Sequence, residues 1–267
     1  DKDLVLEVRR AFVDNPDFGD DDFMTKLKRQ MKHASAPAQK LMAEMLWALL
    51  LFPSNMKART KRLQIKDIWA LSGEELSDNH PCLHDDVLIG IGSGGPGFNN
   101  YRPLELEFLI HIASELKTLD QTTRQSIFSN YDAFVAWIET VTKKGHRQFR
   151  HMLRYFSFPD RVERMSSNRD RISILDKFKV APERETIKWT DRQLDNALWN
   201  LRSRLQNERP NETLDFYMPS LKNIWSQEHQ VKTEEGEVTV IVPTDEEEET
   251  EQMSIPATAG AGEARQS

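Results

Sequence analysis

Apolar side chains recur every three or four residues along most of the chain, which is the period of a helix with one buried face. Short breaks rich in Pro, Gly, Asn and Asp separate these stretches, and those residues favour turns. The pattern predicts a mostly α-helical fold, an irregular multi-helical domain. The clearest predicted helices cover residues 4–13, 20–33, 37–52, 63–69, 103–119, 131–141, 147–155, 189–206 and 221–225.

The helix predicted for residues 37–52 is apolar on almost every side. Pro37 suits the first position of a helix, where its missing N–H is not needed. The helix should end at Phe52, because a residue that precedes a proline is disfavoured in the α conformation. A helix without a polar face has to be covered all round. We therefore expect this one to lie at the centre of the core.

A glycine-rich loop follows Val87-Leu88-Ile89, and Gly90, Gly92 and Gly95 formally match GxGxxG. A dinucleotide site also needs a strand before the motif and a helix that starts at its third glycine. Helix signals resume only near Pro103, and the chain contains no GxxxxGK[ST] motif. A structural turn with positive φ angles is therefore favoured over a phosphate site.

His80, Cys82 and His84 alternate in sequence and would face one side if the segment were extended. A structural zinc site normally has four ligands, so we expect a loop with a half-buried thiol rather than a metal site. Cys82 is the single cysteine, and no apolar run of about 18 residues occurs. These features predict a soluble, cytoplasmic protein without a membrane partner.

The composition changes at residue 227, where the chain becomes acidic and then rich in Ala, Gly and Thr. Residues 228–267 carry eleven acidic and two basic residues, a net charge of −9, so residues 1–227 have a net charge of +2 within the total of −7. We predict a helical domain at 1–226 and a disordered acidic linker or tail at 227–267. One isolated strand could form at 237–242.

Residues 142–171 hold nine basic and three acidic residues, with four aromatic residues among them. The order of residues predicts a helix, a stop at Phe158-Pro159-Asp160 and a basic second helix. Such a stretch can contact a phosphate backbone. Alternatively, it is a solvated surface that pairs with acidic faces or with the tail. The nine candidate nucleic-acid-binding residues are Lys143, Lys144, Arg147, Arg150, Arg154, Arg161, Arg164, Arg169 and Arg171.

Catalytic signals are weak in this sequence. The seven histidines are scattered, and no Ser-His-acid arrangement or pair of carboxylates stands out from its spacing. We therefore predict no catalytic residue, no cofactor and no metal ligand in this segment. An independent small-molecule enzyme that uses the glycine loop is the remaining enzymatic alternative.

Four sequence elements occur in a recognisable order and span most of residues 20–225. They are Leu50-Leu51-Phe52-Pro53-Ser54 with Lys61-Arg62; Gly90-Ile91-Gly92-Ser93 through Asn99 to Arg102-Pro103 with 105–110; the helix 147–155 ending in Phe158-Pro159-Asp160 with Glu163-Arg164 and Ser166-Ser167; and Asp215-Phe216-Tyr217 with Pro219. In these elements the chain resembles the region N-terminal to the motor in bacterial McrB-like AAA+ proteins of modification-dependent restriction and related antiphage defence systems.

The resemblance implies a helical module upstream of a ring that hydrolyses GTP or ATP and partners a nuclease. In that family the motor carries the Walker motifs, whereas this chain has none, and its acidic linker stands where a helical connection would be expected. The missing initial methionine, the helical pattern already present at Leu4 and the abrupt end at Ser267 lead us to expect a piece of a longer protein, whose helical domain could begin before residue 1.

We therefore expect a non-catalytic scaffold or DNA-contacting module. The resemblance implies DNA, an AAA+ motor domain and a nuclease subunit as partners. The alternative is a protein-interaction module, unrelated to DNA, whose basic face docks an acidic partner or the chain's own acidic run at 245–251.

Overall fold

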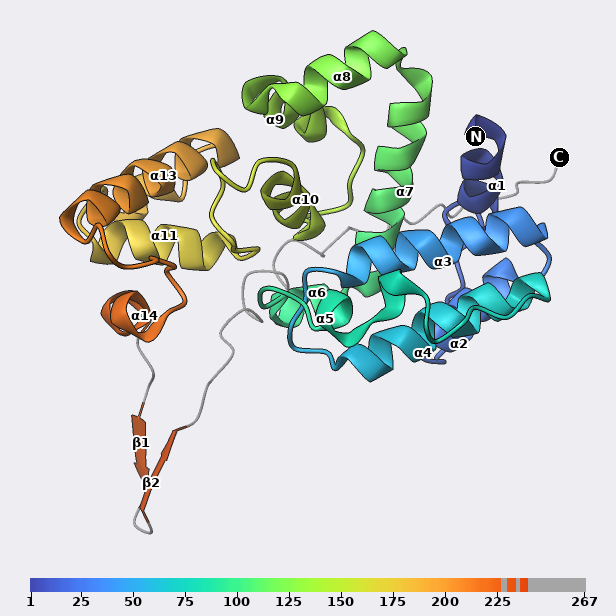
Figure 1. The fold of residues 1–267 in the computed structure, drawn as a ribbon, viewed down its shortest axis with the longest axis horizontal. Coiled ribbons are helices and arrows are strands. Elements are labelled where there is room, and N and C mark those ends of the chain that lie inside the picture. The colour runs from blue at the N-terminus through green and yellow to red at the C-terminus, as the bar shows by residue number, and fades with distance from the viewer. Residues whose placement is uncertain (227–229, 234–235, 240–267) are drawn as a thin grey trace, which may run out of the picture. The chain divides into compact units, whose positions relative to one another are not determined.

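The computed structural model describes residues 1–226, 230–233 and 236–239. The chain divides into two units, Asp1–Gln227 and Glu228–Ser267. The described part of the first unit consists of α-helices, two short 3-10 helices and their connections (Figure 1). The prediction of a mostly α fold is therefore confirmed.

The helices of the first unit follow one another through mostly short connections. The first half contains α1 (Lys2–Phe12), α2 (Phe23–Met31), α3 (Ala36–Leu50), α4 (Ala58–Trp69), η1 (Ala70–Ser72), η2 (Pro81–Leu83), α5 (Asp85–Leu88), α6 (Gly95–Asn100) and α7 (Arg102–Thr118). The second half contains α8 (Gln121–Ser129), α9 (Tyr131–Thr140), α10 (Phe149–Ser157), α11 (Asn168–Lys177), α12 (Glu183–Thr186), α13 (Asp191–Glu208) and α14 (Pro219–Trp225).

Side-chain caps explain where several of these helices begin. The Asp22 carboxylate accepts hydrogen bonds from the first amides of α2, and the Ser35 hydroxyl caps α3. At α13, Thr190 and Gln193 form a reciprocal capping box. Asp120 caps α8, a helix that the apolar pattern does not predict because Ile127 is its one buried residue.

The predicted central helix is α3, whose residues Leu46, Leu49 and Leu50 are fully buried. It packs against α1, α4 and α7, so that helices cover it on several sides (Figure 1). The expectation of a central core helix is therefore confirmed, and it follows from the lack of a polar face.

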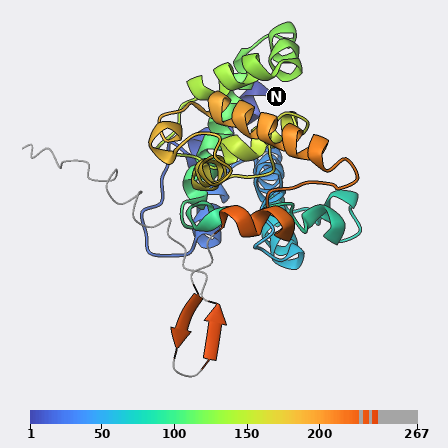
Figure 2. The same ribbon diagram turned by 90° about the vertical axis from the view of Figure 1, so that its left-hand side faces the viewer.

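The buried apolar residues of the first unit form two main clusters. The N-terminal cluster runs from Val5 to Met152 and involves α1 to α10. The C-terminal cluster runs from Met165 to Trp225 and joins α11, α13 and α14. Figure 2 shows these last three helices in front of the N-terminal ones. Helix α10 lies between the two groups (Figure 1).

The glycine loop forms the predicted turn. Gly90 and Gly95 have φ angles of 80° and 72°, the left-handed region that glycine adopts without a steric penalty. Helix α6 begins at Gly95, earlier than the sequence predicts, but the helix α5 precedes the loop where a dinucleotide fold would have a strand. The main chain of Gly90 also lies against the Pro53 carbonyl, which leaves no room for a Cβ.

The described part of the second unit is an antiparallel pair of strands, β1 (Gln230–Thr233) and β2 (Gly236–Thr239), with Val231 opposite Val238. The sequence predicts one isolated strand at 237–242. The observed β2 overlaps this range and has a partner. The rest of the predicted disordered acidic tail, 240–267, lies outside the described residues.

Helices long and apolar enough to cross a membrane are missing from the part of the chain with described positions.

The glycine turn provides a test of the fold. We expect Gly90→Ala to lower the free energy of unfolding by about 2–4 kcal/mol, because a Cβ there meets the Pro53 carbonyl in a strained conformation. Gly73 has the same φ of 80° but open space around its Cβ position. Gly73→Ala should therefore cost only about 1 kcal/mol. Urea denaturation measures both values, and equal losses would show that the close approach to Pro53 is unimportant.

Candidate functional site

The nine basic residues predicted to bind nucleic acid fall into two groups in the structure. Lys144 and Arg169 are exposed, and Lys143, Arg161 and Arg164 are half-buried. The other four are buried: Arg147, Arg150, Arg154 and Arg171. A buried guanidinium group cannot reach a phosphate backbone while the fold is intact. The candidate nucleic-acid-binding role therefore needs correction for these four residues.

The reason for the correction is that α10 is covered on two sides. Its sequence predicts an apolar face containing Phe149, Met152 and Phe156, with arginines facing solvent. Phe149 and Met152 are indeed buried, but Phe156 is partly exposed. Arg154 instead points towards α13 and is fully buried. Helical periodicity reveals which residues share a face, but it does not show whether a polar face is met by water or by another helix.

Asp191, at the start of α13, is the main counter-ion of these arginines. Its Oδ2 lies 2.6 Å from Arg154 Nη1 and 3.4 Å from Arg150 Nε. Its Oδ1 lies 2.9 Å from Arg171 Nη1. Burial alone would raise the pKa of Asp191, but the surrounding guanidinium groups outweigh it and hold that pKa far below its usual range. The carboxylate is therefore ionised at every ordinary pH.

Asp195, one helical turn further along α13, completes the cluster. Its Oδ2 lies 3.3 Å from Arg154 Nε and accepts a hydrogen bond of 2.7 Å from the Tyr131 hydroxyl. Arg171 pairs with the other oxygen of Asp195. This central ionic cluster, defined as Arg150, Arg154, Arg171, Asp191 and Asp195, joins helices α10, α11 and α13.

His151 lies inside the central ionic cluster without carrying charge. Burial and the neighbouring arginines lower its pKa well below the usual value, so the imidazole is neutral at neutral pH. Its Nδ1 is 3.3 Å from Arg171 Nη1. Three arginines then face two aspartates, and Glu139 lies at the edge, 3.7 Å from Arg150. Since unpaired buried charges are costly, this near balance is what allows the arginines to be buried.

Arg147, the fourth buried arginine, has a separate environment. It lies over the Tyr101 ring and 3.5 Å from the Glu105 carboxylate of α7. Glu105 also accepts hydrogen bonds of 2.9 Å from the amides of Gln148 and Phe149. Helix α10 has no side-chain cap of its own. Glu105 therefore supplies acceptors for amides at the start of α10 from another helix.

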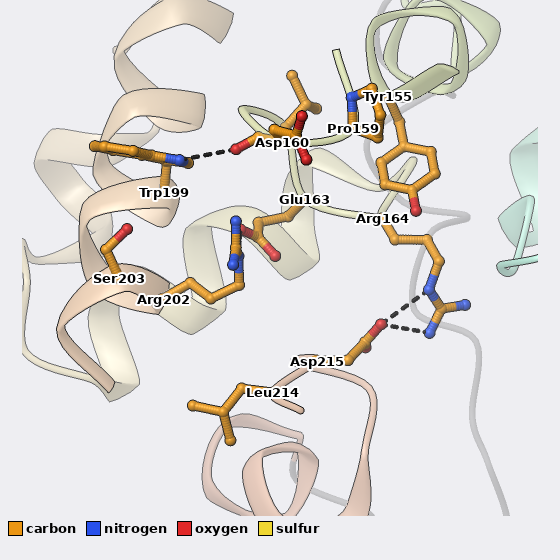
Figure 3. Close-up of a pocket in the computed structure, with 11 residues that line it drawn as sticks. Tyr155, Pro159, Asp160, Glu163, Arg164, Trp199, Arg202, Ser203, Leu214 and Asp215 are labelled. Carbon is orange, nitrogen blue, oxygen red and sulfur yellow. Dashed lines mark hydrogen bonds and ion pairs between the residues drawn. The ribbon is translucent and has the colours of Figure 1, made fainter. Parts of the chain in front are cut away.

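The second polar site is a recess of about 430 Å³ in the C-terminal part of the first unit (Figure 3). The loop after α10, helix α13 and the loop before α14 line it. Glu163 Oε1 pairs with Arg202 Nε at 2.5 Å, and Arg164 donates two hydrogen bonds of 2.7 and 2.9 Å to Asp215 Oδ2. Burial raises the pKa of Glu163 to about 7. We call this hollow the arginine recess.

The histidine and cysteine segment shows no metal site. His80 caps the 3-10 helix Pro81–Leu83, so the segment is not extended as a shared ligand face would need. Cys82 is exposed, contrary to the half-buried thiol expected from the sequence. Within the described residues, His, Cys, Asp and Glu side chains form no group of three or more that could hold a metal ion.

Asp191 and Asp195 are the important residues that the sequence does not single out. One signal for them was present, since both fall on the face of α13 that also carries the buried residues Leu194 and Leu198. Acidic residues within an apolar stripe need buried partners. The identity of those partners depends on the tertiary fold.

The central ionic cluster predicts a large effect of one substitution. We expect Arg154→Met to lower the free energy of unfolding by about 3–5 kcal/mol, because it leaves two buried carboxylates undercompensated. The matched control is Arg169→Met on the exposed face of α11, which should change stability by less than about 0.5 kcal/mol. Urea denaturation near pH 7 measures both. Similar losses in the two variants would contradict the assigned role of Arg154.

Comparison of the chain with family models, with curated proteins and with solved structures finds no match. The contacts described above are thus what the chain itself offers for assigning a function.

Proposed function

We propose that this chain is a non-catalytic helical module of a bacterial McrB-like AAA+ restriction or antiphage protein, and that it acts as a scaffold upstream of the NTPase motor. The observation that carries the proposal is that the four sequence elements of the resemblance contact one another in the fold. Elements that are distant in sequence but adjacent in space form one structural unit.

The first and second elements are joined through main-chain hydrogen bonds. The Ile91 amide donates to the Phe52 carbonyl at 2.9 Å, and the Ser54 amide donates to the Gly92 carbonyl at 2.7 Å. Lys61, also in the first element, is buried and donates to the Pro53 carbonyl at 2.5 Å. Burial lowers the pKa of Lys61 to about 8. The basic residue in the first element therefore stabilises the turn.

The second and third elements meet at two places. The Ser166 hydroxyl donates to the Ser93 carbonyl at 2.8 Å. The Glu105 carboxylate accepts a hydrogen bond from the Phe149 amide at the start of α10. The ring of Phe52, from the first element, also packs edge-on against Tyr155 of α10. The third element is thus attached to both of the preceding ones.

The third and fourth elements are joined by an ion pair between Arg164 and Asp215. Tyr217, which follows in the fourth element, donates a hydrogen bond of 2.6 Å to Asp170 of α11. These contacts use the polar groups of the elements to hold helices together. Because the polar residues of the four elements bind one another, they support a structural role. We therefore favour a scaffold over a catalytic module.

The proposal is tested in cells that carry the complete native gene. We expect the wild-type gene to reduce plaque formation by phages with modified DNA. Arg154→Met should abolish this protection because it disrupts the fold, whereas Arg169→Met should retain it. If the wild-type gene restricts no phage in a panel with modified and unmodified DNA, the proposal is wrong. Loss of protection in the Arg169 variant would indicate a surface role instead.

Contact with DNA is a second candidate function, and it rests on the predicted basic residues that stay accessible. The Lys144 side chain is 66% exposed, although it pairs with Glu107, and Arg169 is exposed on α11. Both come from the stretch that the sequence analysis identified, and both can reach a phosphate group without unfolding.

The DNA role predicts that duplex binding weakens with salt and that the double variant Lys144→Glu with Arg169→Glu lowers the slope of log affinity against log salt by about 2. The matched control reverses two exposed lysines outside the stretch, Lys117→Glu with Lys188→Glu. Fluorescence anisotropy with a labelled duplex measures the affinity. Equal losses in both double variants would indicate non-specific attraction, and binding of polyglutamate in place of DNA would favour an acidic protein partner.

A further inference from the structure

The proposed scaffold uses the Arg164–Asp215 ion pair of the arginine recess, but it leaves other hydrogen-bonding groups of the recess without a role. Its volume of about 430 Å³ falls in the range of small-molecule sites. Trp199, Arg202 and Ser203 of α13 line one wall, and Arg164 and Asp215 lie opposite (Figure 3). The side chains in it therefore come from segments that are far apart in sequence.

Most of the acceptors in the recess already have a donor. Glu163 Oε1 accepts from Arg202 Nε, and Asp215 Oδ2 accepts from Arg164. The other oxygen of Asp215 accepts from the Tyr217 amide at 2.7 Å. A cationic ligand would have to compete for these occupied oxygens.

Several donors in the recess are free. Among the described residues, neither η nitrogen of Arg202 has an acceptor, and Nη1 of Arg164 has none. The two side chains are 25% and 30% exposed, so a ligand can reach them. A guanidinium group with open N–H bonds is suited to carboxylate and phosphate oxygens.

The surrounding charges also favour an anion. The Arg161 guanidinium lies 4.6 Å from the centre of the Trp199 ring, which places another positive charge beside the recess. That ring face is therefore not available to a cationic ligand. Asp160 is the remaining acid, and it is exposed at the rim, where solvent and salt weaken its repulsion.

We propose that the arginine recess binds a small oxyanion, a carboxylate or a phosphate ester, through the free η nitrogens of Arg202 with Arg164 as the second cation. Glu163 controls the site because its carboxylate is the group that neutralises Arg202. When Glu163 is protonated, the positive charge of Arg202 is available to the ligand. When Glu163 is ionised, the internal ion pair competes with the ligand.

The structure sets the pH range of this control. Burial raises the pKa of Glu163, Arg202 opposes the rise, and Asp215 and Asp195 add to it, so that the pKa lies at about 7. Glu163 is thus mostly neutral below pH 7 and mostly ionised above it, so anion binding should be tighter on the acidic side. The charged groups around Glu163 are Asp195 and Arg202 on α13, Asp215 before α14, and Asp160 and Arg164 on its own segment.

The test uses the whole chain with sulfate and with acetate, because neither anion changes charge between about pH 6 and pH 8. Isothermal titration at constant ionic strength measures both affinities. If only the protonated form of Glu163 is competent, the affinity at about pH 6 should exceed that at about pH 8 roughly tenfold. The anion that binds more tightly distinguishes a phosphate-type from a carboxylate-type ligand.

Three variants make the test specific. Glu163→Gln mimics the neutral carboxyl group and should bind the anion equally at both pH values, at least as tightly as the wild type at pH 6. Arg202→Gln should lose binding, whereas Lys188→Gln, at an exposed position outside the recess, should keep it. Thermal unfolding checks that each variant is folded, and the Glu163 variant keeps the test valid if the Arg202 variant is not.

The proposal is overturned if the wild type shows no saturable binding of either anion at pH 6, or if a folded Arg202 variant binds as well as the wild type. A Glu163 variant that keeps the pH dependence would exclude control by this residue. Equal loss in the Lys188 variant would show that the anion binds to general surface charge. None of these results depends on whether the chain belongs to a restriction system.

Discussion

Asp191 and Asp195 of α13 hold the guanidinium groups of Arg154 and Arg171 in the interior, where helices α10, α11 and α13 meet. Burying these charges costs free energy unless each has a partner of opposite sign at short distance. The N-terminal apolar cluster includes Phe149 and Met152 of α10, whereas the described members of the C-terminal cluster do not include a residue of α10. The packing of α10 against α11 and α13 thus depends on these ion pairs being complete.

Polar contacts recur at the other junctions of the first unit. Glu105 of α7 accepts a hydrogen bond from the Phe149 amide at the start of α10, and Ser166 donates one to Ser93 of the glycine loop. Arg164 forms an ion pair with Asp215 ahead of α14. Hydrogen bonds of this kind are directional, whereas apolar contacts tolerate sliding. They therefore fix how the helices are arranged. The four sequence elements on which we base the proposed McrB-like role coincide with these junctions, which is why we favour a structural role for them.

The arginine recess differs from the central ionic cluster in one physical respect. In the cluster each arginine is buried and forms an ion pair with Asp191, and Arg154 and Arg171 also pair with Asp195. In the recess Arg202 and Arg164 are each held by a single carboxylate and keep exposed N–H groups. Arginine–carboxylate pairs therefore connect helices in the central ionic cluster, whereas in the arginine recess they leave N–H groups open to a ligand. The difference is that the cluster is buried and the recess is partly exposed.

The sequence alone determined the helical character of the chain, the central position of α3 and the glycine turn. Each of these follows from local rules: an apolar period, the lack of a polar face, a residue that tolerates positive φ. The environment of the arginines was decided only by the tertiary structure. The same spacing in α10 suits a solvated basic face or a face buried against acids, and the choice depends on Asp191 and Asp195, which are near only after folding.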